Sequence, residues 1–399
     1  MDVLEPVIQH YAWGSRQAIA ELQGRAAPAD QPEAELWMGA HPSSPSGLER
    51  GARHTTLDQV IAADPARELG ARCADQFDGR LPFLLKVLAP DKALSIQVHP
   101  DRVQAQAGYQ AEEQQGIPRG DRSRNYVDDW PKPELLCAIT RFEVLAGFRG
   151  VTDTLILLDE LAAPALAPVA DMLRAENAST GRAGALAWAL SRPPGERETL
   201  QDEVLAACRR VAAGPGPHAA ACVAVLQIAA DHPGDPGVVA ALLLNYQVLE
   251  PDEALFMAAG GLHAYLKGVG VELLANSDNV LRAGLTGKHI DVPELLRIAD
   301  PAVAVPIVRP RPVADGVFAY DAPVQEFRLY RMNLTGSPGT VPDQGPRIAL
   351  CITGTATLRT RGGDAVKLTR GGSCFLSAAD GTVTASGDGT LFVAASGCG

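Results

Sequence analysis

The feature that most constrains this chain is a sequence pattern that changes twice along its 399 residues. Residues 1–149 carry short apolar runs bounded by Gly and Pro, among them 81–88 and 93–99, which are typical of strands. Residues 150–245 carry apolar side chains at helical spacing, and strand-like runs return at 254–257 and continue to the end. Short strands on both sides of a helical stretch, without regular strand–helix alternation, predict a mainly β fold of jelly-roll barrels with a helical insert.

The charge balance argues against a nucleic-acid-binding protein. Lys and Arg number 35 and Asp and Glu number 47, so the net charge is −12 and the overall field repels a phosphate backbone. A local basic pocket for one small phosphate is compatible with this balance. The hydrophobic fraction of 46%, against 21% charged residues, is typical of a packed globular core.

The sequence also predicts a compartment. Its first residues lack the basic and apolar regions of a signal peptide, and no apolar run reaches the ~20 residues that a membrane span needs. The seven cysteines are scattered without a Cys-x-x-Cys pair, which favours reduced thiols over a disulfide framework or a thiolate zinc site. We therefore expect a cytoplasmic protein with neither membrane nor nucleic acid as a partner.

Three polar residues alternate with apolar ones near position 97. Because side chains in a strand alternate between two faces, Ser95, Gln97 and His99 share one face, and Ile96 and Val98 share the other. If the apolar face packs on the core, the polar face lines a cavity. An ordinary half-exposed strand explains the same pattern.

Two further segments supply metal-ligand chemistry. Glu134 follows Lys132 in a stretch that Pro131 and Pro133 stiffen, and His263 follows a glycine pair that permits close backbone approach. A surface Lys/Glu pair and a core histidine are the ordinary explanations. Together with Gln97 and His99, however, these residues offer two imidazoles, a carboxylate and an amide oxygen. That donor set suits Zn²⁺ with a position left for water or substrate.

The segment 275–288 combines charges in a turn-rich stretch. Asp278, Arg282 and Lys288 could provide an acid/base group and an anion clamp, whereas a solvated loop is the ordinary explanation for such a run. A structural ion pair between Asp278 and Arg282, four residues apart, is a further alternative.

These motifs resemble type I mannose-6-phosphate isomerases. The matching segments occur in the family's order, and they are Gln-His-Tyr-Ala-Trp-Gly at 9–14, Glu-Leu-Trp-Met-Gly-Ala-His-Pro at 35–42, Leu-Ser-Ile-Gln-Val-His-Pro at 94–100, Lys-Pro-Glu at 132–134, Gly-Leu-His-Ala-Tyr at 261–265 and Ser-Asp-Asn-Val-Leu-Arg-Ala-Gly at 277–284. The resemblance covers residues 1–295 well, is weaker in the helical stretch and is faint after about residue 300.

The resemblance implies a fold of two cupin-like jelly-roll barrels plus an inserted α-helical domain. It places a catalytic cupin-like domain at 1–149 with 246–300, the helical insert at 150–245 and a C-terminal jelly-roll domain at 301–399. The implied activity interconverts mannose 6-phosphate and fructose 6-phosphate, a step of carbohydrate metabolism that leads toward GDP-mannose. The implied partner is a small sugar phosphate, and we expect a monomer.

The resemblance also assigns site residues. The family's ligands for one zinc ion per chain align with Gln97, His99, Glu134 and His263. Its essential arginine aligns with Arg282. The remaining implied pocket residues divide into the catalytic candidates Lys132, Glu272 and Asp278 and the substrate- or phosphate-binding candidates Lys86, Ser95 and Lys288.

Two positions depart from the family pattern. The family usually has His before Lys-Pro-Glu, where this chain has Pro131, so a proton relay through that histidine has no carrier here. Leu262 stands where a proline often precedes the ligand histidine. Neither departure removes a metal ligand.

The chemistry of an aldose–ketose isomerase suggests roles for these groups. The reaction passes through an enediol(ate), and zinc near its oxygens acts as a Lewis acid. Asp278 and Glu272 are both candidate bases, with Lys132 as a partner, and the sequence does not choose between them. An iron-dependent cupin oxygenase and a non-catalytic, metal-containing cupin that binds sugar phosphates are the alternatives.

Overall fold

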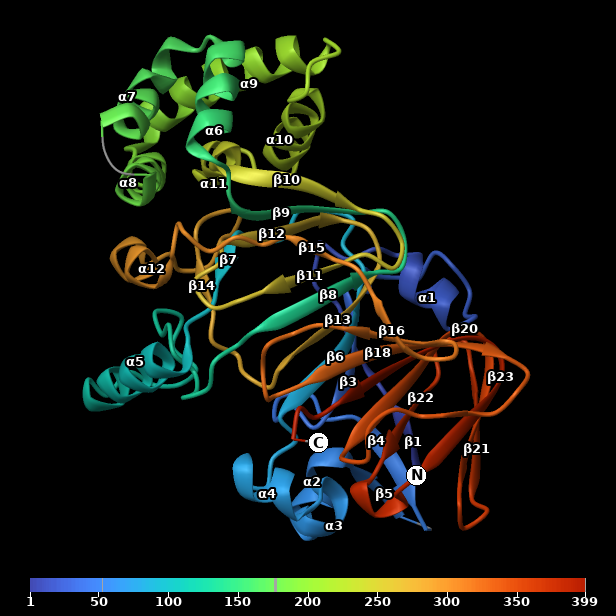
Figure 1. The fold of residues 1–399 in the computed structure, drawn as a ribbon. Helices are drawn as coiled ribbons and strands as arrows, with labels where there is room; N and C mark the ends of the chain where they lie inside the picture. Colours follow the sequence, from blue (N-terminus) through green and yellow to red (C-terminus); the bar gives the residue numbers. More distant parts are fainter. Residues whose placement is uncertain (52, 176–177, 399) are drawn as a thin grey trace.

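Three antiparallel sheets form the framework of the computed structural model, which describes residues 1–51, 53–175 and 178–398. The strands form three sheets, and a group of helices lies at one end of the molecule (Figure 1). The chain is therefore mainly β, as the sequence predicts. Among the described residues, no helix combines the length and apolar character needed to cross a membrane.

Two of the sheets carry the site. The seven-stranded sheet has the order β15-β11-β8-β13-β6-β3-β2, with bounds β2 Val7–Gln9, β3 Glu35–Gly39, β6 Phe83–Leu88, β8 Glu134–Ala138, β11 Ala254–Met257, β13 Gly270–Ala275 and β15 Ile307–Val308. The five-stranded sheet has the order β10-β9-β12-β7-β14, with bounds β7 Gln97–Val98, β9 Phe142–Phe148, β10 Leu244–Leu249, β12 His263–Lys267 and β14 Leu281–Arg282. A core cluster with Leu136, Val144, Leu255 and Tyr265 joins the two sheets.

The third sheet joins the two ends of the chain. It holds β1 Asp2–Glu5, β4 Gly47–Arg50, β5 Arg53–Thr56, β16 Arg311–Ala314, β17 Val317–Tyr320, β18 Arg328–Thr335, β19 Gly339–Thr340, β20 Arg347–Thr360, β21 Ala365–Thr369, β22 Ser373–Leu376 and β23 Val383–Ala395. Strand β1 pairs with β22, with Asp2 opposite Phe375. N-terminal strands thus share a sheet with C-terminal ones, and β15 from beyond residue 300 pairs with β11. Hydrogen bonding therefore crosses the predicted boundary at 300/301.

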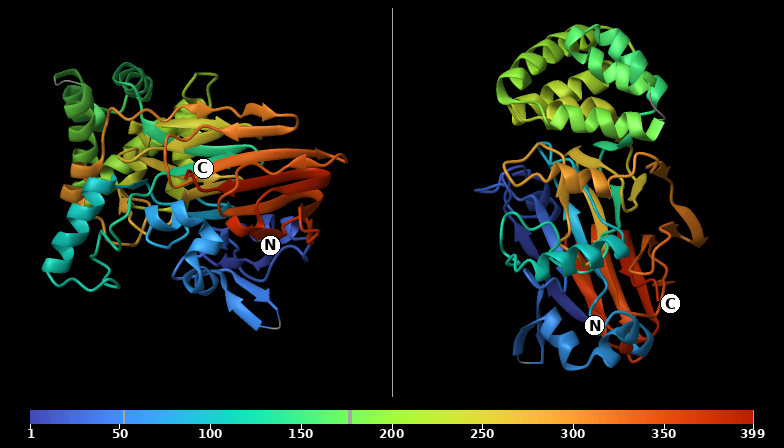
Figure 2. Two further views of the ribbon diagram at one scale, coloured as in Figure 1. Left: turned by 60° about the horizontal axis from the view of Figure 1, so that its bottom comes forward. Right: turned by 90° about the vertical axis from the view of Figure 1, so that its left-hand side faces the viewer.

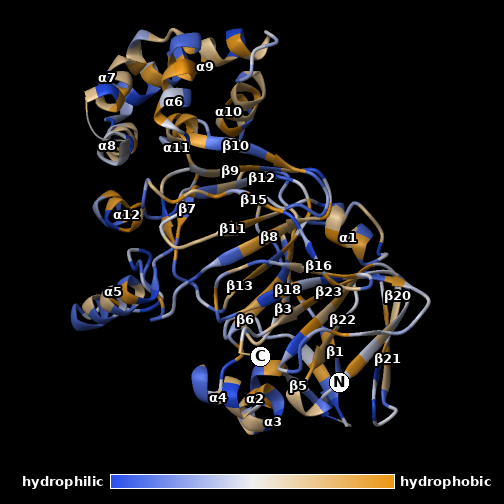
Figure 3. Ribbon diagram, viewed as in Figure 1, coloured by the Kyte–Doolittle hydropathy of each residue, from blue (hydrophilic) through white to orange (hydrophobic). Residues whose placement is uncertain are grey.

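The helices between β9 and β10 form a layer of their own (Figures 1 and 2). They are α6 Val151–Leu161, η1 Pro164–Leu166, α7 Ala167–Ala175, α8 Ala178–Leu190, α9 Pro194–Ala212, α10 Ala219–Asp231, α11 Gly237–Ala240 and η2 Ala241–Leu243. Hydrophobic and hydrophilic segments alternate along them (Figure 3), because one side of each helix packs on its neighbours. Other helices are α1 Ala18–Leu22, α2 Leu57–Ala63, α3 Pro65–Leu69, α4 Ala71–Gln76, α5 Arg102–Gln114, α12 Val292–Ile298 and η3 Ala378–Asp380.

A close backbone contact fixes the helical layer to the loop that follows Arg282. The carboxylate of Asp235 accepts hydrogen bonds from the backbone N–H groups of Gly237 at 2.7 Å, Leu285 at 2.7 Å and Thr286 at 3.0 Å. Gly284 has a φ of +113°, and a Cβ atom there would lie 2.5 Å from the Cα of Gly237. The approach therefore needs glycine at position 284.

We predict that Gly284→Ala lowers the free energy of unfolding by about 2 kcal/mol or more, because the new methyl group meets backbone and the φ angle becomes strained. Gly287→Ala is the matched control in the same loop, since nothing lies within 4 Å of its added Cβ. Thermal unfolding of both variants tests this, and equal melting temperatures would contradict the predicted contact.

Candidate metal centre and adjoining pocket

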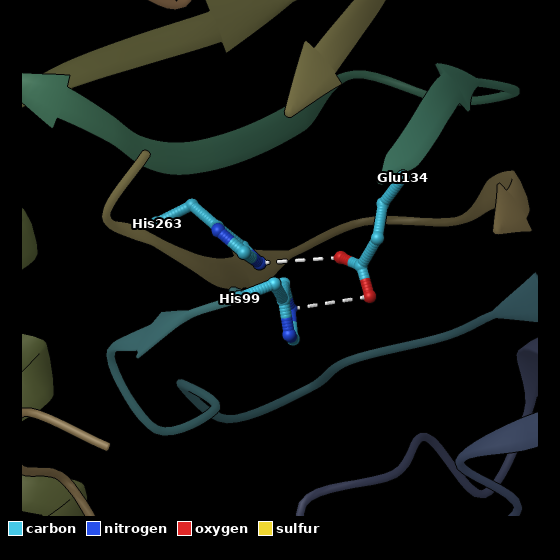
Figure 4. A group of neighbouring side chains, drawn as sticks. All are labelled: His99, Glu134 and His263. Carbon is cyan, nitrogen blue, oxygen red and sulfur yellow. Dashed lines mark ion pairs between the residues drawn. The ribbon is translucent and has the colours of Figure 1, made fainter. Parts of the chain in front are cut away.

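Three buried side chains from separate parts of the chain converge at one point. His99, Glu134 and His263 are 2%, 3% and 2% exposed. The Nε2 atom of His99 lies 3.3 Å from Oε1 of Glu134, and Nε2 of His263 lies 3.2 Å from Oε2 (Figure 4). The ligand atoms all lie within 4.8 Å of one another. The structure thus brings together three of the four predicted ligands.

Backbone carbonyls fix the orientation of both imidazoles. The Nδ1 of His99 donates to the carbonyl oxygen of Asn279 at 2.7 Å, and the Nδ1 of His263 donates to that of Gly261 at 3.2 Å. A carbonyl only accepts, so each Nδ1 carries the proton and the Nε2 lone pair of the neutral ring is left for the centre. Burial disfavours the charged imidazolium and lowers the pKa of His99 to about 4. The negative charge of Glu134 opposes this shift, and the positive charge of Lys132 adds to it.

Gln97, the fourth predicted ligand, lies on strand β7. It lies directly opposite His263 of β12 and Arg282 of β14 in the sheet register. Its Nε2 donates to Oγ of Ser95 at 3.1 Å, which leaves the amide oxygen available as a ligand. Ile96 and Val98 are fully buried, whereas Ser95 and Gln97, which alternate with them, line the adjoining pocket.

The regular strand is shorter than the predicted run 93–99. Only Gln97–Val98 is a strand. The N–H of Leu94 bonds to Tyr265 and that of Ile96 bonds to Gly284, so the preceding residues hydrogen-bond to separate segments instead of forming one ladder.

The cluster fits a tetrahedral divalent metal. For bonds of about 2.05 Å, ligand atoms of a tetrahedral zinc site lie about 3.3 Å apart, and each imidazole Nε2 lies at about this distance from one oxygen of Glu134, His99 from Oε1 and His263 from Oε2. The Nε2 atom of His99 is buried and has no hydrogen-bond partner among the described residues. An unpartnered lone pair facing a carboxylate is unfavourable without a cation between them. Burial opposes ionisation of Glu134, but the charge of His99 when that ring is protonated, together with the charge of Lys132, outweighs burial and holds the pKa of Glu134 well below the ordinary value.

A pocket of about 550 Å³ adjoins the cluster. Gln97 and Lys132 form part of the pocket wall, and the cluster lies behind them. The Nζ of Lys132 is 3.3 Å from Oε1 of Glu134, so this side chain contacts both the pocket and a ligand. The predicted site residues that line the pocket are Lys86, Ser95, Gln97, Lys132, Asp278, Arg282 and Lys288. Glu272 does not line it.

Glu272 lies behind Lys86 in a buried charge cluster. The Nζ of Lys86 is 3.2 Å from Oε2 of Glu35 and 3.4 Å from Oε2 of Glu272. The indole N–H of Trp37 donates to Glu35, and the Lys86 ammonium lies over the Trp37 ring. Burial raises the pKa of Glu272 to about 7, against the opposing effect of Lys86. The charge of Lys86 is therefore already balanced within the protein.

Arg282 and Lys288 provide positive charge that the protein leaves uncompensated. Among the described residues, neither forms an ion pair, and Arg282 does not pair with Asp278 as one alternative suggested. Burial lowers the pKa of Arg282, and burial with the nearby Arg282 charge lowers that of Lys288. Two unpaired cations in one pocket wall form a binding site for an anion.

The sequence did not indicate several residues that line the pocket. Asp278 contacts His41, whose Nε2 lies 3.3 Å from Oδ1 of the carboxylate. The helical layer contributes Asp231 and His232 to the wall. His41 and Glu35 stand within a motif quoted above, but no local spacing links them to partners more than 50 residues away. His232 lacked any pattern that distinguished it from a surface histidine.

Pro131 lies on the side of its segment that faces away from the pocket. With Pro133 it lines a separate cavity of about 610 Å³, whereas Lys132 between them lines the pocket above the cluster. Side chains of an extended segment alternate in this way. The departure from the family at position 131 therefore removes no side chain from the pocket wall.

Comparison with known proteins gives one family throughout. Residues 1–151 match the family model "Phosphomannose isomerase type I, catalytic domain", and residues 319–396 match "Mannose-6-phosphate isomerase, cupin domain". The mannose-6-phosphate isomerase of Escherichia coli (strain K12) is 38% identical over 389 residues, which covers 96% of each chain.

Solved structures agree with this. A variant of phosphomannose isomerase from Salmonella typhimurium superposes with a TM-score of 0.91 at 35% identity, covering 99% of each chain. A zinc-bound mannose 6-phosphate isomerase gives a TM-score of 0.89 at 36% identity, again covering 99% of each chain. The resemblance seen in the sequence is thereby confirmed.

We predict that Zn²⁺ raises the melting temperature of the chelator-treated protein, because an ion that binds only the folded chain stabilises it. His99→Ala loses this response through a drop in zinc affinity of more than about 100-fold. His54→Ala, at a side chain 63% exposed, responds like the wild type. A zinc-induced shift that persists in His99→Ala would place the ion elsewhere.

Proposed function

The chain belongs to the type I phosphomannose isomerases, and from that premise we propose that it interconverts mannose 6-phosphate and fructose 6-phosphate. We assign its zinc ion to Gln97, His99, Glu134 and His263. The observation that carries the proposal is the buried His–Glu–His cluster directly behind a pocket that holds two unpaired cations. Bound there, zinc supplies a Lewis acid that stabilises negative charge on the sugar oxygens.

The arrangement proposed for the chain is two cupin-like jelly rolls with an inserted helical domain. The cupin-domain match at 319–396 and the position of α6 to α11 between β9 and β10 support it. The division into 1–149 with 246–300, 150–245 and 301–399 stays a prediction, as do the monomeric state and the cytoplasmic location.

Arg282 and Lys288 bind the phosphate in this proposal. A guanidinium forks onto phosphate oxygens and stays protonated, and no protein carboxylate competes for it among the described residues. Ser95 Oγ in the same wall offers a further hydrogen bond to the substrate. Lys86 is less suited to this task, because Glu35 and Glu272 already hold its ammonium group.

Asp278 is the proton-transfer base in this proposal. Its carboxylate is about half exposed and lines the pocket, whereas Glu272 is buried behind Lys86. Starting from the open-chain aldose, Asp278 takes the proton from C2. The C2–H electron pair forms the C1=C2 bond, and the π pair of the C1 carbonyl moves onto O1, which accepts a proton from Lys132, beside Glu134 in the pocket wall. Asp278 then returns its proton to C1, where the C1=C2 pair forms the new C–H bond, and the O2 hydroxyl proton passes back to Lys132 as the C2 carbonyl forms.

Direct turnover tests this proposal. Zinc-loaded protein should convert mannose 6-phosphate to fructose 6-phosphate, and a chelator should remove the activity until zinc is restored. In Arg282→Ala, kcat/KM should fall by about 100-fold or more with the zinc content unchanged, because a charge-assisted phosphate contact is lost. Lys367→Ala, at an exposed position of β21, is the control.

The isomerase activity and the assignment of Arg282 to the phosphate are tested separately. Zinc-loaded wild-type protein without turnover would contradict the isomerase activity itself. Normal kinetics in Arg282→Ala would leave the activity in place and overturn only the phosphate assignment.

A further inference from the structure

His41 is a buried histidine with no role in the chemistry described so far. It follows strand β3 and is 3% exposed, and its ring meets Trp37 edge-on with centroids 4.9 Å apart. Its Nε2 faces the pocket through Asp278, at 3.3 Å from Oδ1. A buried imidazole whose outward nitrogen meets a catalytic carboxylate does more than fill the core.

Hydrogen bonds determine which nitrogen of His41 carries the proton. The backbone N–H of Ser43 donates to Nδ1 at 3.3 Å, and the hydroxyl of Ser43 lies 2.8 Å from the same atom. A backbone N–H only donates, so Nδ1 holds the lone pair and Nε2 carries the hydrogen. The Nε2–H of His41 is therefore directed at Asp278.

The backbone around Asp278 is held independently of His41. The N–H of Asp278 donates to Oδ2 of Asp128 at 2.8 Å, and the hydroxyl of Ser277 donates to Oδ1 of the same side chain at 2.7 Å. The amide of Asn279 donates to the carbonyl of Asp128 at 2.7 Å, and the carbonyl of Asn279 orients the ligand His99. The position of the Asp278 Cα is thus fixed, while the side-chain torsions are left for another contact to set.

We infer that His41 is a positioning residue that holds the Asp278 carboxylate in one orientation toward the substrate carbons. The inference rests on the proposed function, in which Asp278 moves the proton. His41 lines the same pocket wall as Asp278. It acts through its N–H on Asp278, so its removal leaves metal and phosphate binding intact and impairs the proton transfer.

The surroundings of Asp278 set the direction of the expected pH effect. The titratable groups that face Asp278 are His41, Lys86, Lys132, Asp128 and Tyr11. Burial opposes ionisation, but the hydrogen bond from His41 and the charges of Lys132 and Lys86 outweigh it, so the pKa of Asp278 lies below its ordinary value. Loss of the His41 N–H removes part of that stabilisation of the carboxylate. The acidic limb of the pH profile then moves to higher pH.

The test compares two variants at His41. We predict that His41→Ala lowers kcat for mannose 6-phosphate about 10- to 100-fold, with KM and zinc content unchanged, and shifts the acidic limb upward by about half a unit to one unit. In His41→Gln the amide nitrogen can take the place of Nε2–H, so kcat should return to within about fivefold of the wild type. His218→Ala is the control, because that imidazole also contacts a carboxylate, at 2.9 Å from Glu160, but in the helical layer.

A double-mutant cycle with Asp278→Asn completes the test. Since His41 acts through Asp278, His41→Ala should cost almost nothing in kcat once Asp278 is already Asn. Additive losses, an unshifted pH limb, or a Gln variant no better than Ala would overturn the inference while the isomerase activity stands. An inactive wild-type enzyme would instead contradict the proposed function, and this inference with it.

Discussion

The interaction on which the site depends is the burial of one carboxylate among imidazoles. Glu134 is 3% exposed and ionised, and removing such a charge from water is unfavourable unless cations and hydrogen bonds replace the water. Both facing imidazoles have their Nδ1 protons committed to backbone carbonyls, so each turns an Nε2 lone pair toward Glu134 when neutral. Lys132 supplies only part of the missing positive charge. A divalent cation at the centre supplies the remaining positive charge, and this is why the cluster fits zinc.

Sheet pairing brings this centre together from distant segments. The register of β7 with β12 and β14 sets Gln97 beside His263 and Arg282, so the predicted fourth metal ligand and the arginine proposed to bind phosphate lie on neighbouring strands. Asp235 then binds the loop after Arg282 to the helical layer, and β1 joins β22 at the other end. The pocket wall therefore combines residues of both site sheets and of the helical layer, although its chemistry comes from a few residues.

Local sequence predicted the elements better than their partners. The apolar run at 219–230 became helix α10, Ala219–Asp231, and the break at 214–217 separates it from α9, because Gly and Pro end helices wherever the chain folds. Contacts between residues far apart in the sequence have no comparable local signal such as a Gly or Pro. Nothing near position 2 indicates that it pairs with Phe375, and nothing near His41 indicates a contact with Asp278.

The candidate site divides in the same way. Gln97, His99, Glu134 and His263 could be named because their donor types suit zinc and the family motifs align on them. The location of Glu272 could not, since its distance from the pocket depends on how Lys86 packs between two carboxylates. Whether Pro131 removes a pocket group also depended on the direction of one side chain, which the alternation of an extended segment settles only once that segment is placed.

The measurement that tests the central claim most directly is anomalous diffraction at the zinc edge from crystals of the zinc-loaded protein. We expect one strong peak at about 2.0–2.2 Å from Nε2 of His99, Nε2 of His263 and the Glu134 carboxylate, with the Gln97 amide oxygen as the fourth ligand. A peak at any other site, or an empty cluster beside normal activity, would contradict the account of the buried carboxylate.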